Sequence, residues 1–367
     1  MIVVSSDTKL DFDDVLIVPQ RSTLTSRQEI ITERTFKFYH SPRVWTGVPI
    51  ICANMSFASF NLAKALYHHK MITCLHKYHS TESIAKFYSE NNKDIYDYVW
   101  VSIGYKKSDL NHLLELKNKT GIQPNLCIDV PNGHMDVFVK YCKKVRENFP
   151  DSIIMAGNVT NSSSTQELLI YGGVDVVKCG VGGGSACLTR FVTGCGYPQL
   201  SCCIENSYVA HGLQSSPKKL GLICSDGGHK NSGDICKALC AGADFVMLGG
   251  YFAGVDECDG EWEFGGDYSK TVELNEKTKG KFTYYGMSSH HAQDTFEDGK
   301  KNYRASEGTK IVVPYKGTAS NIIQELLGGV RSACCYIGAD NIKNMSRCAG
   351  FCRVSKVHNN QNPVFGV

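Results

Sequence analysis

The sequence has no apolar run as long as the ~18 residues that a membrane-spanning helix needs. It also has no basic block and no arginine-rich tail, and its 39 Lys and Arg residues are nearly balanced by 36 Asp and Glu residues. Nucleic-acid-binding proteins usually show a clear basic excess. These absences argue against a membrane protein and against a nucleic-acid partner.

Cys-x-x-Cys pairs are absent too, although the chain has 17 cysteines. The nearest approximations, Cys236 with Cys240 and Cys348 with Cys352, have three intervening residues and lie in helix-like sequence. That spacing disfavours a zinc knuckle. An odd number of cysteines, with no signal peptide in residues 1–10, indicates free thiols in a reducing compartment. We therefore expect a cytoplasmic protein.

Eight short apolar segments recur along the chain, and each ends in small or polar residues. They are continuous rather than alternating, which is typical of parallel strands buried on both faces. Amphipathic stretches of helical length separate them, so the pattern predicts an α/β fold, a (β/α)8 TIM barrel formed as one domain by residues 1–367. An open doubly wound sheet is the alternative. The segments are residues 49–55, 71–77, 98–104, 124–130, 152–159, 174–182, 220–228 and 243–250.

Two of the connections are too long to be plain turns. The first follows the sixth expected strand and contains a glycine-rich loop with a cysteine, which we expect to be an active-site loop. The second, residues 251–318, follows the eighth strand and is rich in Gly, Lys, Asp and His. A long polar insertion on the catalytic rim indicates a flap. Disordered decoration is the alternative for residues 260–281.

Glycine clusters follow each of the last three expected strands. The first, in the sequence KCGVGGGSACLTR of residues 178–190, lacks the Gly-Lys-Ser/Thr of a P-loop and does not follow the first strand as a Rossmann fingerprint does. The others are residues 227–228 and 249–250. Each pair alone is typical of a tight turn, but glycine loops after the last strands of a barrel often bind phosphate through their N–H groups. Asp226 could then accept hydrogen bonds from the hydroxyls of a ribose.

Cys187 follows the glycine run and lies near Arg190, whereas most other cysteines lie in apolar strand or helix sequence. An accessible thiol beside a cation is favoured as the thiolate, which is the form that attacks a substrate carbon. Cys195, between Gly194 and Gly196, is the local competitor but lies farther from the strand end. The pattern alone therefore ranks Cys187 first and Cys195 second as a nucleophile.

Taken together, the motifs resemble the IMP dehydrogenase/GMP reductase family. The motifs LDFDDVLIVP, IMAGNV, GVGGGSACLTR, SDGGHKNSGD, GADFVMLGG, YYGMSS and YRASEG occur in this order over about residues 10–355. YYGMSS followed by YRASEG resembles the reductase branch, as does the Arg that follows Thr189. The dehydrogenase branch usually has a Gln after that Thr.

The resemblance implies an NADPH-dependent oxidoreductase of purine metabolism that converts GMP to IMP and ammonia. Cys187 would attack C2 of the guanine ring and form a thioimidate, and hydride from NADPH would then reach C2. Thr189 and Glu307 would relay a proton to the departing ammonia. This arrangement is chemically reasonable, because an aromatic amino group leaves only once it is protonated.

The ligand-binding residues are likewise implied by the resemblance. GMP would contact Ser185, Asp226, Gly227, Gly228, Gly249, Gly250, Gly286, Met287, Ser288, Arg304, Ala305, Ser306 and Gly308. NADPH would contact Ser26, Arg27, Lys77, Asp129, Val130, Pro131, Met287, Tyr303, Arg304, Ser332, Ala333, Cys334 and Cys335, some of them across the subunits of a homotetramer. The metal K+ would be bound by carbonyls of Gly182, Gly184, Cys187 and Arg190.

Three positions depart from the family pattern. Leu188 replaces a second Thr beside the nucleophile, Ser56 replaces an Asp, and Gly183 replaces a Pro. None of them removes a residue implied in the chemistry, so the expected activity is unchanged.

The sequence disfavours two functions other than that of the reductase. An NAD-dependent oxidase of IMP would need a flap base that residues 286–317 do not show. A silent purine-nucleotide-binding barrel would be expected to have lost Cys187, Thr189 or Glu307, and all three are present.

Overall fold

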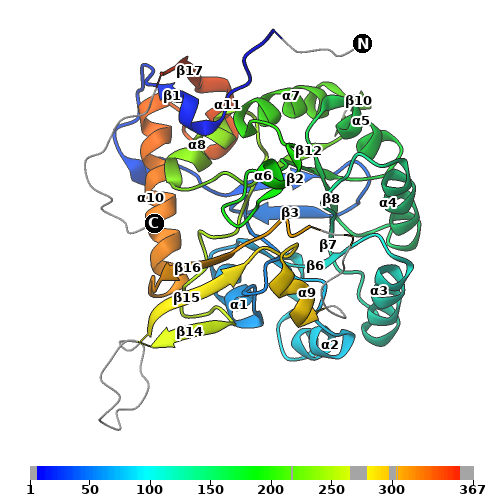
Figure 1. The fold of residues 1–367 in the computed structure, drawn as a ribbon. Helices are drawn as coiled ribbons and strands as arrows, with labels where there is room; N and C mark the ends of the chain where they lie inside the picture. Colours follow the sequence, from blue (N-terminus) through cyan, green and yellow to red (C-terminus); the bar gives the residue numbers. More distant parts are fainter. Residues whose placement is uncertain (1–5, 216–217, 265–278, 297–302, 304, 356–367) are drawn as a thin grey trace, which may run out of the picture.

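The structure, a computed structural model, describes residues 6–215, 218–264, 279–296, 303 and 305–355. Its centre is a closed barrel of eight parallel strands that neighbour one another in chain order (Figure 1). The predicted TIM barrel is thereby confirmed, and the open sheet is excluded. The strands are β4 (Ile50–Cys52), β5 (Ile72–Leu75), β6 (Val99–Ile103), β7 (Leu126–Asp129), β8 (Ile154–Val159), β9 (Val176–Cys179), β12 (Leu222–Asp226) and β13 (Phe245–Leu248).

A ring of helices surrounds the barrel, and side-chain caps begin several of them. The side chains of Ser59, Ser80, Asn161 and Asn231 each accept a hydrogen bond from a backbone N–H of the first helical turn, which satisfies a donor that would otherwise be unpaired. The helices are α1 (Phe60–His68), α2 (Thr81–Ser89), α3 (Lys107–Thr120), α4 (Asp136–Asn148), α5 (Ser162–Ile170), α7 (Gln199–Gly212), α8 (Ser232–Cys240) and α10 (Ala319–Ile337).

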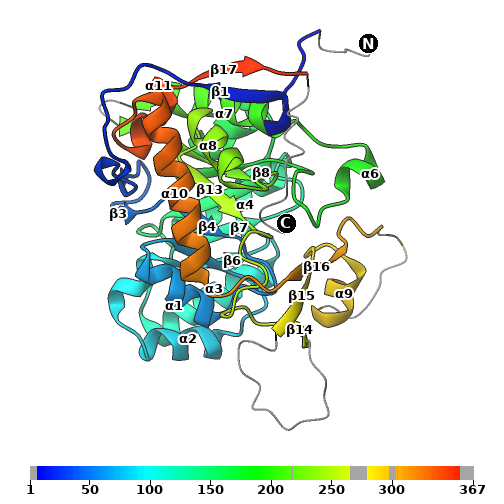
Figure 2. The ribbon, with the colours of Figure 1, turned by 90° about the vertical axis from the view of Figure 1, so that its left-hand side faces the viewer.

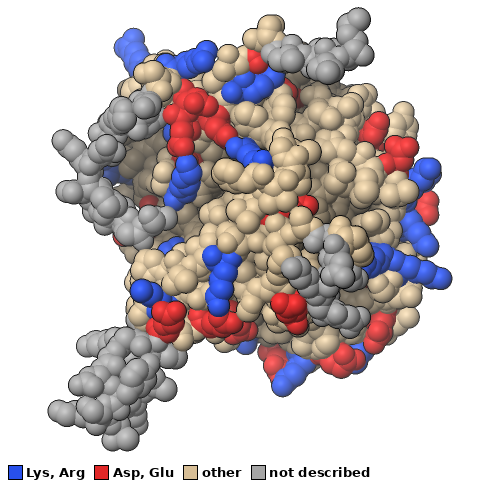
Figure 3. Space-filling model, in the orientation of Figure 1, with Lys and Arg blue, Asp and Glu red and all other residues tan. Residues whose placement is uncertain are grey.

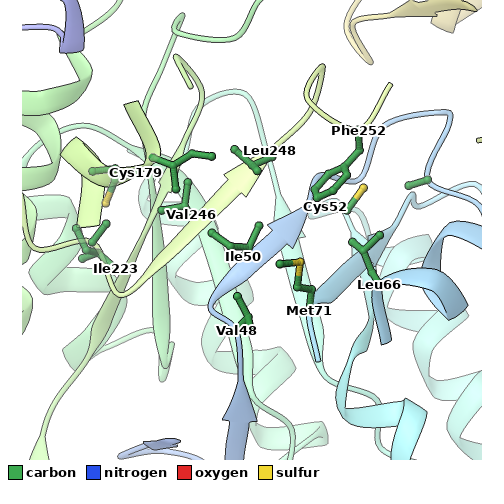
Figure 4. Packing of buried hydrophobic residues seen from close by; sticks show 14 of the residues in the cluster. Val48, Ile50, Cys52, Leu66, Met71, Cys179, Ile223, Val246, Leu248 and Phe252 are labelled. Atoms are coloured by element: carbon green, nitrogen blue, oxygen red, sulfur yellow. The ribbon is translucent and has the colours of Figure 1, made fainter. Parts of the chain in front are cut away.

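One buried cluster lies between the barrel and these helices and a second lies inside the barrel, as continuous apolar strands predict. Figure 4 shows part of the first cluster, where Met71 lies between Ile50 of β4 and Leu66 of α1. On α4 the buried residues are Phe138, Cys142 and Val145, which belong to the face that the 3.6-residue period predicts. Packing of these faces holds the strand ends in place.

A hairpin closes the N-terminal end of the barrel. It consists of β2 (Arg34–Lys37) and β3 (Val44–Gly47). The ring of Phe36 stacks 4.4 Å from that of Phe245 of β13, and the Trp45 ring lies 5.5 Å from Phe245. Because aromatic side chains fill this end, the opposite, C-terminal end is the open one.

Near the two ends of the chain, β1 (Val15–Val18) pairs with β17 (Gly350–Arg353) in an antiparallel ladder. Short elements complete this region, namely the 3-10 helices η2 (Arg27–Glu29) and η5 (Ile342–Asn344) and the helix α11 (Met345–Cys348). No helix in the described part of the chain is long and apolar enough to cross a membrane.

The two long connections occupy the same side of the molecule (Figure 2). The connection after β9 contains the short helix α6 (Thr189–Thr193). The insertion after β13 contains the helix α9 (His290–Phe296) and an antiparallel sheet of β14 (Glu261–Phe264), β15 (Lys279–Tyr285) and β16 (Lys310–Pro314). Disordered decoration was the alternative for residues 260–281. Of these, residues 265–278 lie outside the described residues, and β14 and β15 flank them.

Among the described residues, the surface on this side carries no large patch of one charge. Basic and acidic side chains are mixed around the face that Figure 3 shows, and its centre is formed mostly by other residues. This agrees with the near-balance of charge in the sequence.

Candidate active site

A cavity of about 690 Å³ opens at the C-terminal ends of the barrel strands. Its walls come from the segments that follow the barrel strands and from the insertion after β13. Its volume is within the range of small-molecule sites, about 300–1,000 Å³, and in TIM barrels this end carries the chemistry. The lining includes Asn54, Lys77, Tyr105, Pro131, Asn158, Ser185, Cys187, Asp226, Gly249, Tyr284, Met287 and Glu307.

The three residues expected in catalysis form one hydrogen-bonded row in this cavity. The thiol of Cys187 lies 3.2 Å from Oγ1 of Thr189, and that hydroxyl donates a hydrogen bond of 2.7 Å to Oε2 of Glu307. All three residues line the cavity and are partly accessible. A thiol, a hydroxyl and a carboxyl in series can bind a substrate carbon and pass a proton nearby. Cys195 is exposed and lies outside the lining residues.

Backbone pairing between the loop after β9 and the insertion aligns this row. The amide of Leu188 donates to the carbonyl of Glu307 at 2.7 Å, and the amide of Thr309 donates to the carbonyl of Ala186 at 3.0 Å. Between them, Cys187 and Gly308 form an antiparallel bridge. The carboxyl of Glu307 therefore reaches Thr189 because two main-chain segments are held side by side.

The glycine clusters converge on one part of the cavity. A Cβ on Gly227 would lie 3.0 Å from the amide nitrogen of Gly184, and φ at Gly227 is +94°, so only glycine suits this close approach. A Cβ on Gly250 would lie 2.5 Å from the Tyr284 hydroxyl and 3.1 Å from Oγ of Ser185. The three clusters thus share one concave surface of backbone N–H groups and hydroxyls, which suits an oxyanion.

A buried lysine, which the sequence pattern did not single out as a site residue, links two carboxylates in the wall of the cavity. Lys178 of β9 is 2% exposed, and its ammonium donates to Asp129 and, at 2.9 Å, to Asp226. Burial opposes its charge, yet the two carboxylates raise the pKa of Lys178 well above its ordinary value. Burial acts to raise the pKa of Asp129, but the charge of Lys178 lowers it below its ordinary value. Lys178 and Asp129 therefore both favour their charged forms.

Two asparagines complete this network. Nδ2 of Asn54 donates to Asp129 at 3.1 Å, and Nδ2 of Asn158 donates to Asp226 at 2.9 Å. Oδ1 of Asn158 is buried without a hydrogen-bond partner in the described structure, although the residue lines the cavity. A buried acceptor left open is costly unless a ligand satisfies it. This oxygen fits an amide donor such as the carboxamide of a nicotinamide.

Several other lining residues were not predicted, although each lies directly after a barrel strand or within a motif of the sequence. His76, Tyr105 and Lys106 follow the ends of β5 and β6, as Lys77 does. Tyr284 stands in the YYGMSS motif, and its hydroxyl lies 3.0 Å from Oγ of Ser185. The rule that barrel chemistry follows strand ends would have found the first three.

Most of the predicted binding residues line the cavity, but some do not. Ser26 and Arg27, at η2, and residues 332–335, in α10, are absent from the lining, and η2 and α10 contact each other elsewhere. Ala305 and Ser306 lie near the cavity without lining it, and Ser306 Oγ donates to the Gly308 carbonyl at 2.9 Å. Arg304 lies outside the described residues.

Arg190 differs from the expectation that it lies beside the thiol. Its guanidinium donates to Asp11 at 3.0 Å and to the carbonyl of Tyr197 at 2.7 Å, and it does not line the cavity. A Cβ on Gly182 or Gly196 would meet Cγ of Arg190 within 2.6 Å. The side chain therefore acts as a clamp that ties the loop to the N-terminal segment.

Metal binding by side chains has no support in the described residues, which contain no group of three or more His, Cys, Asp or Glu suited to a metal ion. The carbonyls expected to bind K+ belong to a loop that turns back on itself, where Gly184 O accepts from the amide of Cys187 at 3.0 Å. Carbonyl oxygens are the donor type that K+ prefers. The loop fits such an ion in donor chemistry.

Known proteins match this chain over almost its whole length. Residues 9–363 match the family described as the IMP dehydrogenase / GMP reductase domain. GMP reductase of Shewanella pealeana is 43% identical over 97% of this chain and 98% of its own length. GMP reductase 1 of Mus musculus is 44% identical over 99% of both chains.

A solved structure has the same fold. It is a cysteine-to-alanine variant of GMP reductase from Trypanosoma brucei in complex with guanosine 5′-monophosphate, which superposes with a TM-score of 0.77 over 96% of each chain at 23% identity.

Proposed function

Because this chain belongs to the IMP dehydrogenase / GMP reductase family, we propose that it is a GMP reductase, which converts GMP to IMP and ammonia with NADPH. The observation that carries the proposal is the row of Cys187, Thr189 and Glu307 in the cavity that the glycine clusters also line. The row supplies a nucleophile and a proton source, and the clusters supply a phosphate site.

The first chemical step is addition of the Cys187 sulfur to C2 of the guanine ring. The Sγ–C2 bond forms, the C2 amino group takes up a proton, and the C2–N bond breaks to release ammonia. A covalent thioimidate then links the purine to Cys187. Splitting the reaction at this adduct replaces one difficult substitution by two easier steps.

The proton for ammonia comes through Thr189 and Glu307. The 2.7 Å hydrogen bond between their side chains allows the hydroxyl to give its proton to the leaving nitrogen while it receives one from the carboxyl. Such a positioned acid typically accelerates a reaction by about 10²–10⁴-fold. Bound NADPH supplies the hydride that replaces sulfur at C2 and frees the thiolate.

The contacts that bind the nucleotide are made mostly to its phosphate and ribose, which are remote from the reacting carbon C2. Ser185 and the glycines at 227–228 and 249–250 would bind its phosphate, and Asp226, which Lys178 and Asn158 orient, would bind ribose hydroxyls. Met287, Ser288 and Gly308 of the insertion would contact the base. Remote binding of this kind orients the ring over the nucleophile.

The cofactor site adjoins the base. Lys77, Asp129 and residues 130–131 line the same cavity with Tyr303, and Oδ1 of Asn158 is an open acceptor there. The insertion would serve as a flap over both ligands. K+ would be held by carbonyls of the Cys187 loop.

A homotetramer would account for the predicted cofactor residues that lie apart from the cavity. Ser26, Arg27 and residues 332–335 lie on elements that contact each other, and they would complete the NADPH site of a neighbouring subunit. A cytoplasmic location, where thiols stay reduced, suits a chain whose 17 cysteines are all free.

One assay tests the activity directly. Purified protein is mixed with GMP and NADPH, nicotinamide absorbance is followed, and ammonia and IMP are quantified. We expect loss of NADPH absorbance with one IMP and one ammonia formed per NADPH consumed. Oxidation of IMP with NAD, with no GMP reduction, would instead assign the chain to the dehydrogenase branch.

A further inference from the structure

A second cavity, of about 60 Å³, lies at the opposite end of the barrel from the candidate active site. Asp244, which precedes β13, lies in its wall, so the cavity is at the N-terminal ends of the strands. In TIM barrels this end usually serves stability rather than catalysis. The other lining residues are Arg34, His211, Lys219, Leu239, Gly242, Ala243, Ile342, Lys343, Ser346 and Arg347.

The one carboxylate among these lining residues already has hydrogen-bond partners at both of its oxygens. Oδ1 of Asp244 accepts from Arg34 at 2.8 Å, and Oδ2 lies 2.7 Å from Nε2 of His211 and 3.0 Å from the amide of Ile223. Asp244 is 1% exposed, and the guanidinium of Arg34 also lies 4.3 Å from the centre of the Phe36 ring. This part of the wall is therefore rigid, and its negative charge is neutralised by Arg34.

Three more cations surround the same cavity. Lys219, Lys343 and Arg347 are exposed, and within the described residues none of their side chains forms an ion pair or a hydrogen bond. Partial burial lowers the pKa of Lys219, and the charges of Arg34, Arg347 and Lys343 lower it further against the opposing effect of Asp244. The cavity therefore has an excess of positive charge that the described part of the chain does not neutralise.

The adjacent end of α8 does not account for these cations. Carbonyls at a helix C-terminus attract positive charge when they are unpaired. Here the carbonyls of Lys237, Ala238 and Leu239 accept backbone hydrogen bonds, and that of Ala241 accepts one from Ser207. The cations are thus available to a ligand.

We propose that this cavity binds a phosphate-type oxyanion, either free phosphate or the phosphate group of a nucleotide. Lys219, Lys343 and Arg347 would supply charge-assisted hydrogen bonds, and the Ser346 hydroxyl a further one. A cavity of 60 Å³ encloses one small group, so the remainder of a nucleotide would lie outside it. This site is distinct from the glycine clusters and does not depend on the activity proposed above.

Its test uses a matched pair of variants. Lys343→Gln with Arg347→Gln removes two positive charges at the cavity, and Lys143→Gln with Lys144→Gln removes two from the exposed face of α4. Inorganic phosphate is titrated into each protein by calorimetry at low ionic strength, and thermal unfolding confirms that each variant is folded. Lys219→Gln serves as an independent variant at the cavity.

We expect the cavity variants to bind phosphate at this site at least tenfold more weakly, while the α4 control binds as the wild type does. Equal phosphate binding by the wild type and both cavity variants would overturn the proposal. Titration with GMP separates the two sources. A second GMP per chain that Lys343→Gln with Arg347→Gln removes identifies a nucleotide phosphate, and a single GMP in the wild type identifies free phosphate.

Discussion

Thr189 and Glu307 are 118 positions apart in the chain, yet the Thr189 hydroxyl donates a 2.7 Å hydrogen bond to the Glu307 carboxylate. One residue belongs to the loop after β9, and the other belongs to the insertion after β13. The proton path of the proposed reaction therefore exists only where these two segments meet.

Glu307→Gln keeps the size of the side chain but removes its titratable proton. We expect GMP reduction to fall by roughly 10²–10⁴-fold, as on loss of a general acid. The half-reaction of IMP with NADP+ needs no proton at a leaving nitrogen, so it should be far less affected. Rapid mixing of the variant with IMP and NADP+, without ammonia, measures it as a burst of nicotinamide absorbance.

A burst slowed as much as the forward reaction would show that Glu307 positions a ligand instead. Thr189→Val provides the companion measurement, because it removes the hydroxyl between the acid and the substrate. If the two residues form one relay, the double variant should be no slower than the more impaired single variant.

Cys187→Ala should abolish turnover while GMP still binds. The thiol supplies the covalent bond, whereas the glycine clusters supply most of the affinity. Equilibrium binding of GMP and IMP formation are measured on the same preparation. Cys195→Ala is the control and should retain activity, because Cys195 does not line the cavity. IMP formation by Cys187→Ala would exclude the covalent mechanism.

Gly250→Ala tests the phosphate site. The added Cβ would lie 2.5 Å from the Tyr284 hydroxyl, so Tyr284 and Ser185 must shift. We expect the KM for GMP to rise by roughly ten- to a hundredfold, the cost of one hydrogen bond to a charged group. Guanosine, which lacks the phosphate, should be a very poor substrate of both proteins. Gly212→Ala is the control because nothing lies within 4 Å of its added Cβ.

Stability should fall in acid partly because of His76. Burial, with a contribution from His79, lowers the pKa of His76 to about 3, whereas in the unfolded chain it is near the ordinary value of about 6.5. Between about pH 3 and 6.5 the unfolded chain binds the proton at His76 more readily than the folded chain does. The contribution of neutral His76 to the free energy of unfolding is therefore fully present above about pH 6.5 and is lost as the pH falls.

His76→Gln should therefore reduce the slope of unfolding free energy against pH by roughly 1 kcal/mol per pH unit between about pH 5 and 6. Urea unfolding at several pH values measures the slope. His68→Gln, at an exposed position of α1, should keep the slope of the wild type. An unchanged slope in His76→Gln would contradict the assignment.

Lys178→Met should leave the carboxylates of Asp129 and Asp226 without their cation. We expect the free energy of unfolding to fall by roughly 2–4 kcal/mol. This is near the lower end of the usual cost of breaking a buried ion pair, because both carboxylates also line the cavity. Lys178→Arg keeps the charge and should lose much less. Equal stability of the Met and Arg variants would show that the pairing contributes little.

The barrel was predictable because its signal is local. Each strand is a continuous apolar run, and residues such as Ile72 and Leu75 are buried on either face. The glycine clusters were predictable for the same reason, since they follow the strands directly. Helix ends can carry a local signal too, since α3 ends at Gly121, whose φ is +70°.

The other features of the site were not predictable from local patterns, because they depend on contacts between segments that are distant in the chain. Lys178 lies in an apolar strand, and its partners on β7 and β12 come near it only when the barrel closes. Arg190 is close to the thiol in sequence, but its guanidinium pairs with Asp11 instead. The alignment of Glu307 with Thr189 was available only through the family resemblance, because no spacing rule relates them.

The pairing of residues 186–188 with 307–309 has a consequence for how the protein tolerates change. Its hydrogen bonds join main-chain atoms, so replacement of a side chain does not remove them unless proline takes the place of Leu188 or Thr309. Leucine at position 188 therefore stands beside the nucleophile without any loss of this pairing. Side-chain substitutions in either loop therefore leave the main-chain contact that positions the Glu307 carboxyl in place.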